Sequence, residues 1–110
     1  MENTIEVTQG LTTRQVDNLR QGIGTFGAAI EALKEGKKVA RDGWNGKGMF
    51  LFLVPGSTFK VNRPPLLGIY EEGTEINYCS HIDMKTADEK VVPWLASQTD
   101  VLAKDWCIVD

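Results

Sequence analysis

A glycine-rich turn between two apolar segments is the feature that most limits how this chain can fold. The turn comprises residues 41–48, which read Arg-Asp-Gly-Trp-Asn-Gly-Lys-Gly, and a continuous apolar run, residues 49–54, follows it directly. Glycine permits positive φ and lets a ligand come close to main-chain N–H groups. Trp44 offers a flat stacking face, and Arg41 and Lys47 offer positive charge to an anion. The segment therefore predicts a binding loop that leads into a strand.

The chain before this turn predicts two helices. Residues 1–10 are typical of a frayed end or a short edge strand. Thr12 and Gln15 then fit a capping box, which predicts a helix over about residues 13–21 that stops at Gly22. This helix is short and polar with one narrow apolar stripe, so we expect it to dock on a neighbouring subunit.

The second helix has a stronger pattern. Thr25 is a suitable N-cap and Gly36 a suitable stop. An apolar stripe with helical spacing lies between them and predicts a face that covers the core. The stripe consists of Phe26, Ala29, Ile30 and Leu33.

The chain after this helix predicts short strands over residues 39–41, 49–54, 58–61, 75–84, 91–92 and 106–109. Because residues 49–54 are continuously apolar, we expect both faces of that strand to be covered. Residues 62–73 form a Pro-rich loop, and Pro93 ends a strand or marks a sheet edge. Ser97 and Asp100 predict the cap of a last helix that ends at residue 103, with Val101 and Leu102 facing inward.

This order of elements predicts an α+β fold, a small single domain with a mostly antiparallel sheet packed by two or three helices. The length of 110 residues fits one modest core. We divide the chain into an N-terminal segment, residues 1–24, which docks the oligomer, and a core ligand-binding domain, residues 25–110.

Composition narrows the possible partners. Fifteen acidic and twelve basic residues give a net charge of −3, which argues against a non-specific DNA or RNA binder. The two cysteines lack C-x-x-C spacing, so neither a disulfide framework nor a zinc site is favoured, and a reducing cytosol fits best. The sequence carries no leader-like segment and no apolar run near ~18 residues, which predicts a soluble protein that is not exported and does not bind membranes.

Cys79, His81 and Asp83 are the residues that most resemble a catalytic or metal-binding set. They alternate along one predicted strand, but side chains two apart on a strand lie ~6.5 Å apart, too far for the direct hydrogen bonds of a triad. A metal ion would need a fourth ligand from elsewhere. A polar or ligand-lining strand face is the favoured interpretation, and a small nucleotide-cleaving enzyme that uses these residues stays an alternative.

The three tryptophans differ in context. Trp106 is followed by Cys-Ile-Val, which predicts a core position. Trp44 and Trp94 stand in predicted loops beside polar residues, where ligand binding and core packing are equally open. The glycine turn matches neither the Walker motif nor the dinucleotide fingerprint. Arg41, Lys60, Arg63 and Lys85 are each surface charges by default.

Several separate motifs, in the same order, resemble those of a known family. They are residues 25–36 (Thr-Phe-Gly-Ala-Ala-Ile-Glu-Ala-Leu-Lys-Glu-Gly), 39–49, 82–85 (Ile-Asp-Met-Lys), 93–100 (Pro-Trp-Leu-Ala-Ser-Gln-Thr-Asp) and 103–106. Together they resemble the Thoeris anti-defence 2 family of phages and prophages. The resemblance covers about residues 25–109 and does not extend to the first two dozen residues or to the loop 62–73.

The resemblance implies a sponge and not an enzyme. Such a protein binds the cyclised ADP-ribose signal (glycocyclic ADP-ribose) made by TIR-domain proteins of Thoeris immunity and does not degrade it. It implies a phage-encoded protein in the host cytoplasm, without a cofactor, that assembles with itself, typically as a tetramer with pockets between protomers. It also implies that cyclic dinucleotides can bind at a second site.

The chemistry of the motifs is compatible with such a ligand. Aromatic side chains can stack the adenine at ~1–3 kcal/mol per base, amides and hydroxyls can bond the riboses, and glycine N–H groups with cations can meet the diphosphate. We expect the ligand-binding residues to be Phe26, Arg41, Asp42, Gly43, Trp44, Asn45, Lys47, Met49, Asp83, Met84, Trp94, Ser97, Gln98 and Asp100. A protein-interaction module, in which the Trp and Pro segments bind a partner chain, is the other alternative.

Overall fold

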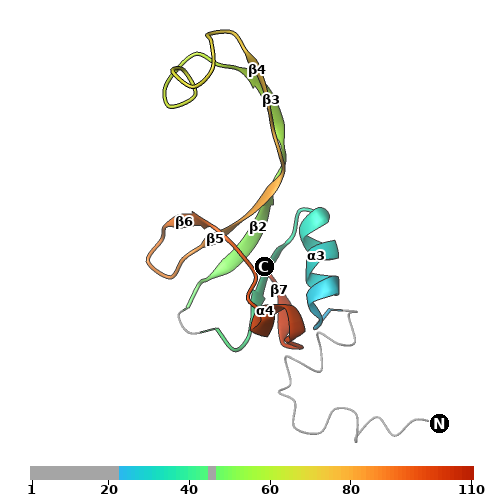
Figure 1. Ribbon diagram of the computed structural model, residues 1–110. Coiled ribbons are helices and arrows are strands. Elements are labelled where there is room, and N and C mark those ends of the chain that lie inside the picture. The colour runs from blue at the N-terminus through green and yellow to red at the C-terminus, as the bar shows by residue number, and fades with distance from the viewer. Residues whose placement is uncertain (1–22, 45–46) are drawn as a thin grey trace, which may run out of the picture.

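The computed structural model describes residues 23–44 and 47–110. The predicted segments 1–10 and 13–21, and the site residue Asn45, lie outside these residues. In the described part, no helix is long and apolar enough to cross a membrane. The elements, in chain order (Figure 1), are α3 (Phe26–Lys34), β1 (Lys38–Arg41), β2 (Phe50–Val54), β3 (Ser57–Lys60), β4 (Glu75–Tyr78), β5 (His81–Lys85), β6 (Val91–Pro93), α4 (Gln98–Leu102) and β7 (Trp106–Val109).

Five of the strands form an antiparallel sheet in the order β6-β5-β2-β1-β7. Helix α3 packs against β1, β2 and β7 and covers one face of this sheet. The core between them contains Leu33 from the helix and Val39, Leu51 and Trp106 from the sheet, all fully buried. The predicted α+β fold with a mostly antiparallel sheet is therefore confirmed, and Pro93 lies in the edge strand β6, as expected.

Helix α3 begins and ends where its local sequence predicts. Thr25 is the N-cap, and its Oγ1 accepts a hydrogen bond from the N–H of Ala28 at 3.1 Å. The predicted apolar stripe faces the core, with Ala29 and Leu33 buried. Gly36 follows the helix with φ +86°, a backbone conformation that glycine adopts without strain.

The prediction of one continuous strand over residues 75–84 is wrong, because the strand is interrupted in the middle. Strand β4 ends at Tyr78 and β5 begins at His81, although the pairing of β2 with β5 continues in the same register into the pairing of β3 with β4. The break faces Pro55, which has no N–H to donate, and the N–H of Gly56 donates to the Oγ of Ser80 at 2.8 Å instead of to a main-chain oxygen. The break between β4 and β5 is therefore caused by Pro55, which lies on the partner strand.

Beyond this break, β3, β4 and the connecting residues 61–74 form a projection that we call the arm. Figure 1 shows it extending away from the five-stranded sheet. Its connecting loop is held by its own main chain, with bonds from the N–H of Tyr70 to the O of Leu66 (2.8 Å) and from the N–H of Gly73 to the O of Val61 (2.8 Å). Val61 is the one buried side chain of the loop.

The expectation that both faces of residues 49–54 are covered is also wrong for the described chain. Only Leu51, on the face toward α3, is buried, and the other residues of β2 are half-buried. Phe50 and Phe52 lie on the opposite face with ring centroids 6.2 Å apart, and the Nζ of Lys38 lies 4.9 Å from the Phe50 centroid. The difference arises because α3 covers one face of the sheet, and alternate side chains of the apolar run point to the other face.

Helix α4 confirms its predicted capping box, because Ser97 and Asp100 exchange hydrogen bonds between side chain and main chain at 3.0 and 3.1 Å. The inward orientation of Val101 and Leu102 is wrong, since Leu102 is 74% exposed and Val101 is exposed as well. The helix has five residues, and its inward position is taken by Asp100.

Candidate ligand site

Four aromatic rings meet beside the N-terminus of α3. The indole of Trp106 is fully buried at their centre, as predicted, and its ring centroid lies 5.6 Å from Phe26, 5.4 Å from Trp44 and 6.1 Å from Trp94. Both indole contacts are edge-to-face, a favourable arrangement of the ring quadrupoles. Phe26, Trp44 and Trp94 are each half-buried, so each packs on the core and keeps part of its surface open.

Arg41 lies between two carboxylates at the end of β1. Its Nε donates to Asp105 Oδ1 at 2.8 Å, and its Nη1 donates to Asp100 Oδ1 at 2.9 Å. The three side chains are only 13–16% exposed, so the default expectation of a surface charge is wrong for Arg41. With one cation against two anions, this cluster has a net charge of −1, so the guanidinium of Arg41 is already neutralised within the chain.

The electrostatics of this cluster follow from its hydrogen bonds. The bond with Asp105 is the main cause that raises the pKa of Arg41. Burial alone would raise the pKa of Asp100 and of Asp105, but hydrogen bonds, first among them those from Arg41, outweigh it and lower both pKa values. Both carboxylates are therefore charged at neutral pH.

The same carboxylates hold the turn that carries Trp44. The N–H of Gly43 donates to Asp105 Oδ2 at 2.7 Å, the N–H of Asp42 donates to the main-chain O of Asp105 at 3.0 Å, and the indole Nε1 of Trp44 donates to Asp100 Oδ1 at 3.4 Å. Asp105 was not among the predicted site residues. Its sequence signals are its place in the motif 103–106 and its position one residue before Trp106, which pairs with Arg41, and that pairing is not visible in a single sequence.

A cavity of about 390 Å³ opens beside this turn, a size within the ~300–1,000 Å³ of small-molecule sites. Within the described residues, Lys47 is exposed and makes no ion pair. The far end of the turn is held by Lys85, whose Nζ donates to the O of Gly48 at 3.0 Å. The lining residues are Ala40, Arg41, Asp42, Trp44, Lys47, Gly48, Met49, Cys107 and Val109.

The structure thus brings seven of the predicted site residues to this corner. Five of them line the cavity: Arg41, Asp42, Trp44, Lys47 and Met49. Gly43 and Asp100 support the turn from behind through the hydrogen bonds described above.

The other predicted residues do not line this cavity. Phe26 and Trp94 belong to the aromatic cluster with Trp44, and Met84 packs against the core. Ser97 caps α4, and Gln98 is exposed at its start. Asp83 pairs across β5 with Phe52 and Pro93, on the sheet face that α3 does not cover.

The possible catalytic set of Cys79, His81 and Asp83 is not assembled as a triad. Cys79 lies in the break between β4 and β5, and the Nδ1 of His81 is 3.2 Å from its main-chain oxygen and not in contact with its thiol. The Nε2 of His81 lies 3.7 Å from Asp83 Oδ2. Among residues 23–44 and 47–110, no group of three His, Cys, Asp or Glu side chains is placed to hold a metal ion.

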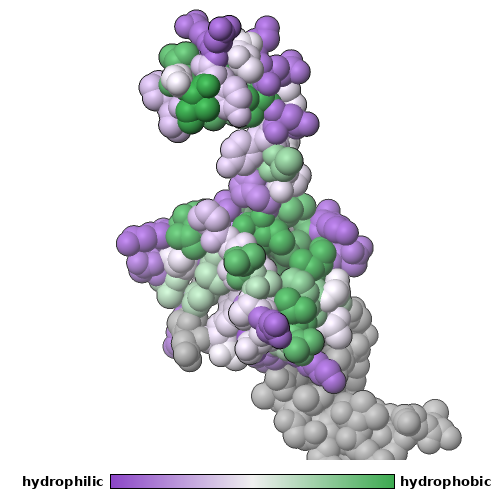
Figure 2. All heavy atoms as spheres, in the orientation of Figure 1, coloured by the Kyte–Doolittle hydropathy of each residue, from purple (hydrophilic) through white to green (hydrophobic). Residues whose placement is uncertain are grey.

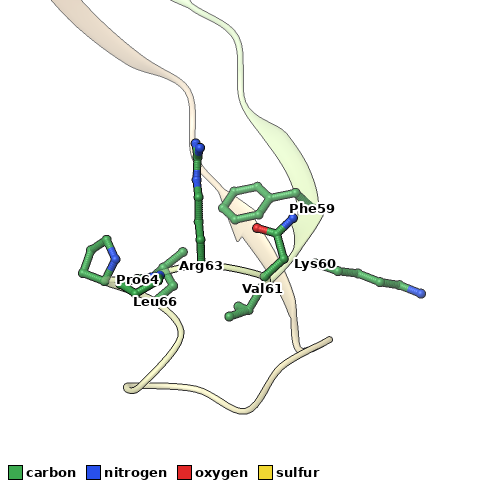
Figure 3. Close-up of a pocket in the computed structure, with 8 residues that line it drawn as sticks. Phe59, Lys60, Val61, Arg63, Pro64 and Leu66 are labelled. Carbon is green, nitrogen blue, oxygen red and sulfur yellow. The ribbon is translucent and has the colours of Figure 1, made fainter.

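A second and larger cavity, of about 470 Å³, lies at the tip of the arm and is lined by residues 59–66. Figure 3 shows Phe59 and Arg63 on the same side of the loop, with Lys60 pointing away. Two prolines, a leucine and a valine supply much of its lining. We place the candidate site at the smaller cavity, because there an indole, the hydrogen-bonded residues 41–44 and a cation without an ion pair in the described chain meet.

Comparison with known proteins bears on the same segment. The family model described as "Thoeris anti-defense 2-like domain" matches residues 24–109. The protein "Thoeris anti-defense 2" of Bacillus phage SP01 is 47% identical over 85 residues, which cover 77% of this chain and 93% of the phage protein. The matched range contains the aromatic cluster, the Arg41 cluster and the cavity.

Proposed function

Because the chain belongs to the Thoeris anti-defence 2-like family, whose role is to protect a phage from Thoeris defence, we propose that it does so as a sponge. It binds glycocyclic ADP-ribose made by TIR-domain proteins and withholds this signal without degrading it. The observation that carries the proposal is the cavity of about 390 Å³ lined by Trp44 and Lys47 inside the family's matched range. We place this activity in the cytoplasm of the infected host.

The roles of the lining residues follow from their surroundings. Trp44 is half-buried and its Nε1 is bonded to Asp100, so it stacks the adenine in a fixed orientation. Lys47 has no acidic partner in the described chain and therefore meets the diphosphate. Arg41 is balanced by two carboxylates, so its contribution to the diphosphate is smaller than its charge suggests.

Other predicted residues complete the site from its margins. Phe26 and Trp94 present partly open rings in the same aromatic cluster, and Ser97 and Gln98 supply ribose-bonding groups at the start of α4. Asp83, Met84 and Asn45 stay predictions from the family resemblance.

The residues of the enzyme alternative do not meet at this cavity. That alternative needs Cys79, His81 and Asp83 beside the bound ligand. Cys107 is the one thiol in the lining, and it is buried with its Sγ 3.4 Å from the O of Ala40. His81 and Asp83 are not among the lining residues.

We also propose that the protein works as a homo-oligomer, a tetramer with pockets shared between protomers. Large apolar side chains are exposed around α4, among them Leu95 at 91% and Leu102 at 74%, and Figure 2 shows further apolar residues over the body and at the tip of the arm. Apolar surface of this kind is typical of an interface. Leu95 and Leu102 flank Ser97 and Gln98, so a second protomer seated there would close the margin of the site.

The proposal is tested with the purified full chain. Glycocyclic ADP-ribose isomers should raise its melting temperature, and heating the complex should release a ligand of unchanged mass by mass spectrometry. The same assay with cyclic dinucleotides, alone and in competition, tests a second ligand class at a separate site. Absence of a shift with every isomer would refute the sponge, and a cleaved product lost in His81→Ala would establish the enzyme alternative.

A further inference from the structure

Asp105 contacts the Trp44 turn at three points. Its Oδ1 accepts from the Nε of Arg41 at 2.8 Å, its Oδ2 accepts from the N–H of Gly43 at 2.7 Å, and its main-chain O accepts from the N–H of Asp42 at 3.0 Å. It therefore fixes three consecutive residues of the turn. A carboxylate that is 13% exposed and bonded on both oxygens is a rigid support.

The support extends from the turn to the indole. Arg41 joins Asp105 to Asp100, and Asp100 Oδ1 in turn accepts the Nε1–H of Trp44 at 3.4 Å. The chain of contacts Asp105–Arg41–Asp100–Trp44 thus sets both the main chain of the turn and the direction of its ring. Asp105 itself is not among the residues that line the cavity.

The same contact leaves little room for a side chain at Gly43. A Cβ built on Gly43 would lie 2.8 Å from Asp105 Oδ2, closer than real Cβ contacts allow, and its next neighbour, the Nη2 of Arg41, lies at 3.6 Å. Gly43 is not among the glycines with positive φ. The need for glycine at this position therefore comes from the close approach of Asp105 and not from the backbone conformation.

From this geometry we propose that Asp105 is a positioning residue of the ligand site, and that Arg41 acts mainly as a brace between Asp105 and Asp100. The assignment rests on the proposed function, because it concerns the site that binds glycocyclic ADP-ribose. A turn fixed before binding loses less conformational freedom when the ligand arrives, which increases affinity. Groups behind a site that orient its contacting residues contribute to binding in the same way.

The test is a mutant cycle at Gly43 and Asp105, with affinity for glycocyclic ADP-ribose measured by isothermal titration calorimetry. Asp105→Ala should weaken binding about tenfold, because the brace and the main-chain bond are lost. Gly43→Ala should weaken it by a similar factor, because its methyl group displaces the Asp105 carboxylate. In the double variant the Gly43→Ala change should add less than a factor of about two, since the carboxylate that it displaces is absent.

Three controls separate positioning from stability. Ile82→Val trims a core side chain on β5 and should lower the melting temperature without changing the affinity. Asp88→Asn removes an exposed carboxylate whose contacts are confined to its own turn and should change neither. Asp105→Asn keeps the size of the side chain and one acceptor oxygen, so it should retain more affinity than Asp105→Ala.

The outcomes distinguish the two proposals. Wild-type protein that binds no isomer refutes the sponge and the positioning role together. Wild-type binding with unchanged affinity in Asp105→Ala and Gly43→Ala refutes the positioning role alone. A double variant whose loss in binding free energy is the sum of the two single losses refutes it as well. If Asp105→Ala does not fold, Gly43→Ala and Asp105→Asn still decide the question.

Discussion

The turn at Trp44 and the tip of the arm are both loops between antiparallel strands, and both border cavities of similar volume. The arm loop is held by hydrogen bonds within its own main chain, such as that from the N–H of Leu67 to the O of Arg63 at 3.0 Å. The Trp44 turn is held by charged side chains from residues about 60 positions further along the chain. The two loops therefore differ in how they are held and not in the size of the cavity beside them. What distinguishes the turn is that distant charges fix its geometry.

The two loops should differ most in the stability that the protein loses when the arginine of each loop is replaced by alanine. Arg41→Ala leaves two nearly buried carboxylates without a cation, and we expect the free energy of unfolding to fall by about 3 kcal/mol. Arg63 at the arm tip makes no ion pair in the described chain. Arg63→Ala should therefore change the free energy of unfolding by less than about 0.5 kcal/mol. Urea unfolding of both variants measures this, and equal losses would contradict the account.

The second difference concerns ligand affinity. Trp44→Ala removes the stacking face and should weaken binding of glycocyclic ADP-ribose by about 10- to 100-fold, the equivalent of ~1–3 kcal/mol. Phe59→Ala removes an aromatic ring from the arm-tip cavity and should leave the affinity unchanged. Calorimetric titration of the wild-type protein and the two variants gives the ratio of their affinities for the ligand. A greater loss in Phe59→Ala would move the site to the arm.

Acid should weaken the turn and leave the arm loop unaffected. The lowered pKa values of Asp100 and Asp105 mean that their contribution to stability is complete above the ordinary carboxyl pKa of ~4 and is lost as the pH falls through their folded-state values. We expect the free energy of unfolding to be flat between pH 7 and about pH 5 and to fall below that. The fall should be smaller in Asp105→Asn, and an identical pH profile in that variant would contradict the assignment.

The smallest effect on folding is expected at the exposed apolar residues beside α4. Leu95→Glu changes a side chain that is 91% exposed, so the free energy of unfolding of the protomer should change by less than about 0.5 kcal/mol. Light scattering after size exclusion should nevertheless show a lower mass, because a buried charge would break the proposed protomer interface. An unchanged oligomeric mass would place the interface elsewhere.

The sequence predicted those features that depend on neighbouring residues. The caps at Thr25 and Ser97 and the apolar stripe of α3 are local patterns, and each was confirmed. The break in residues 75–84 was missed because its cause, Pro55, lies on the partner strand. The outward orientation of Val101 and Leu102 was missed because Arg41 and Trp44, nearly 60 residues away, draw Asp100 inward.

The candidate site likewise combines features that local sequence indicates with features that depend on distant residues. The turn itself, with Trp44, Lys47 and its glycines, is visible as composition and motif. Of its two supporting carboxylates, Asp100 was among the predicted residues and Asp105 was not, because Asp105 meets Gly43 only after β7 has paired with β1, across 62 residues of chain. A single sequence therefore indicated the turn and one of the carboxylates that hold it.

The central claim is that the Trp44 indole receives the ligand, and the indole N–H resonances of ¹⁵N-labelled protein test it most directly. The three tryptophans, Trp44, Trp94 and Trp106, give three such signals, and Trp44→Phe assigns one of them. On addition of glycocyclic ADP-ribose, the Trp44 signal should shift more than that of Trp106, whose Nε1 is bonded to the O of Asp100 inside the core. Saturable binding that leaves the Trp44 signal unmoved would contradict the account.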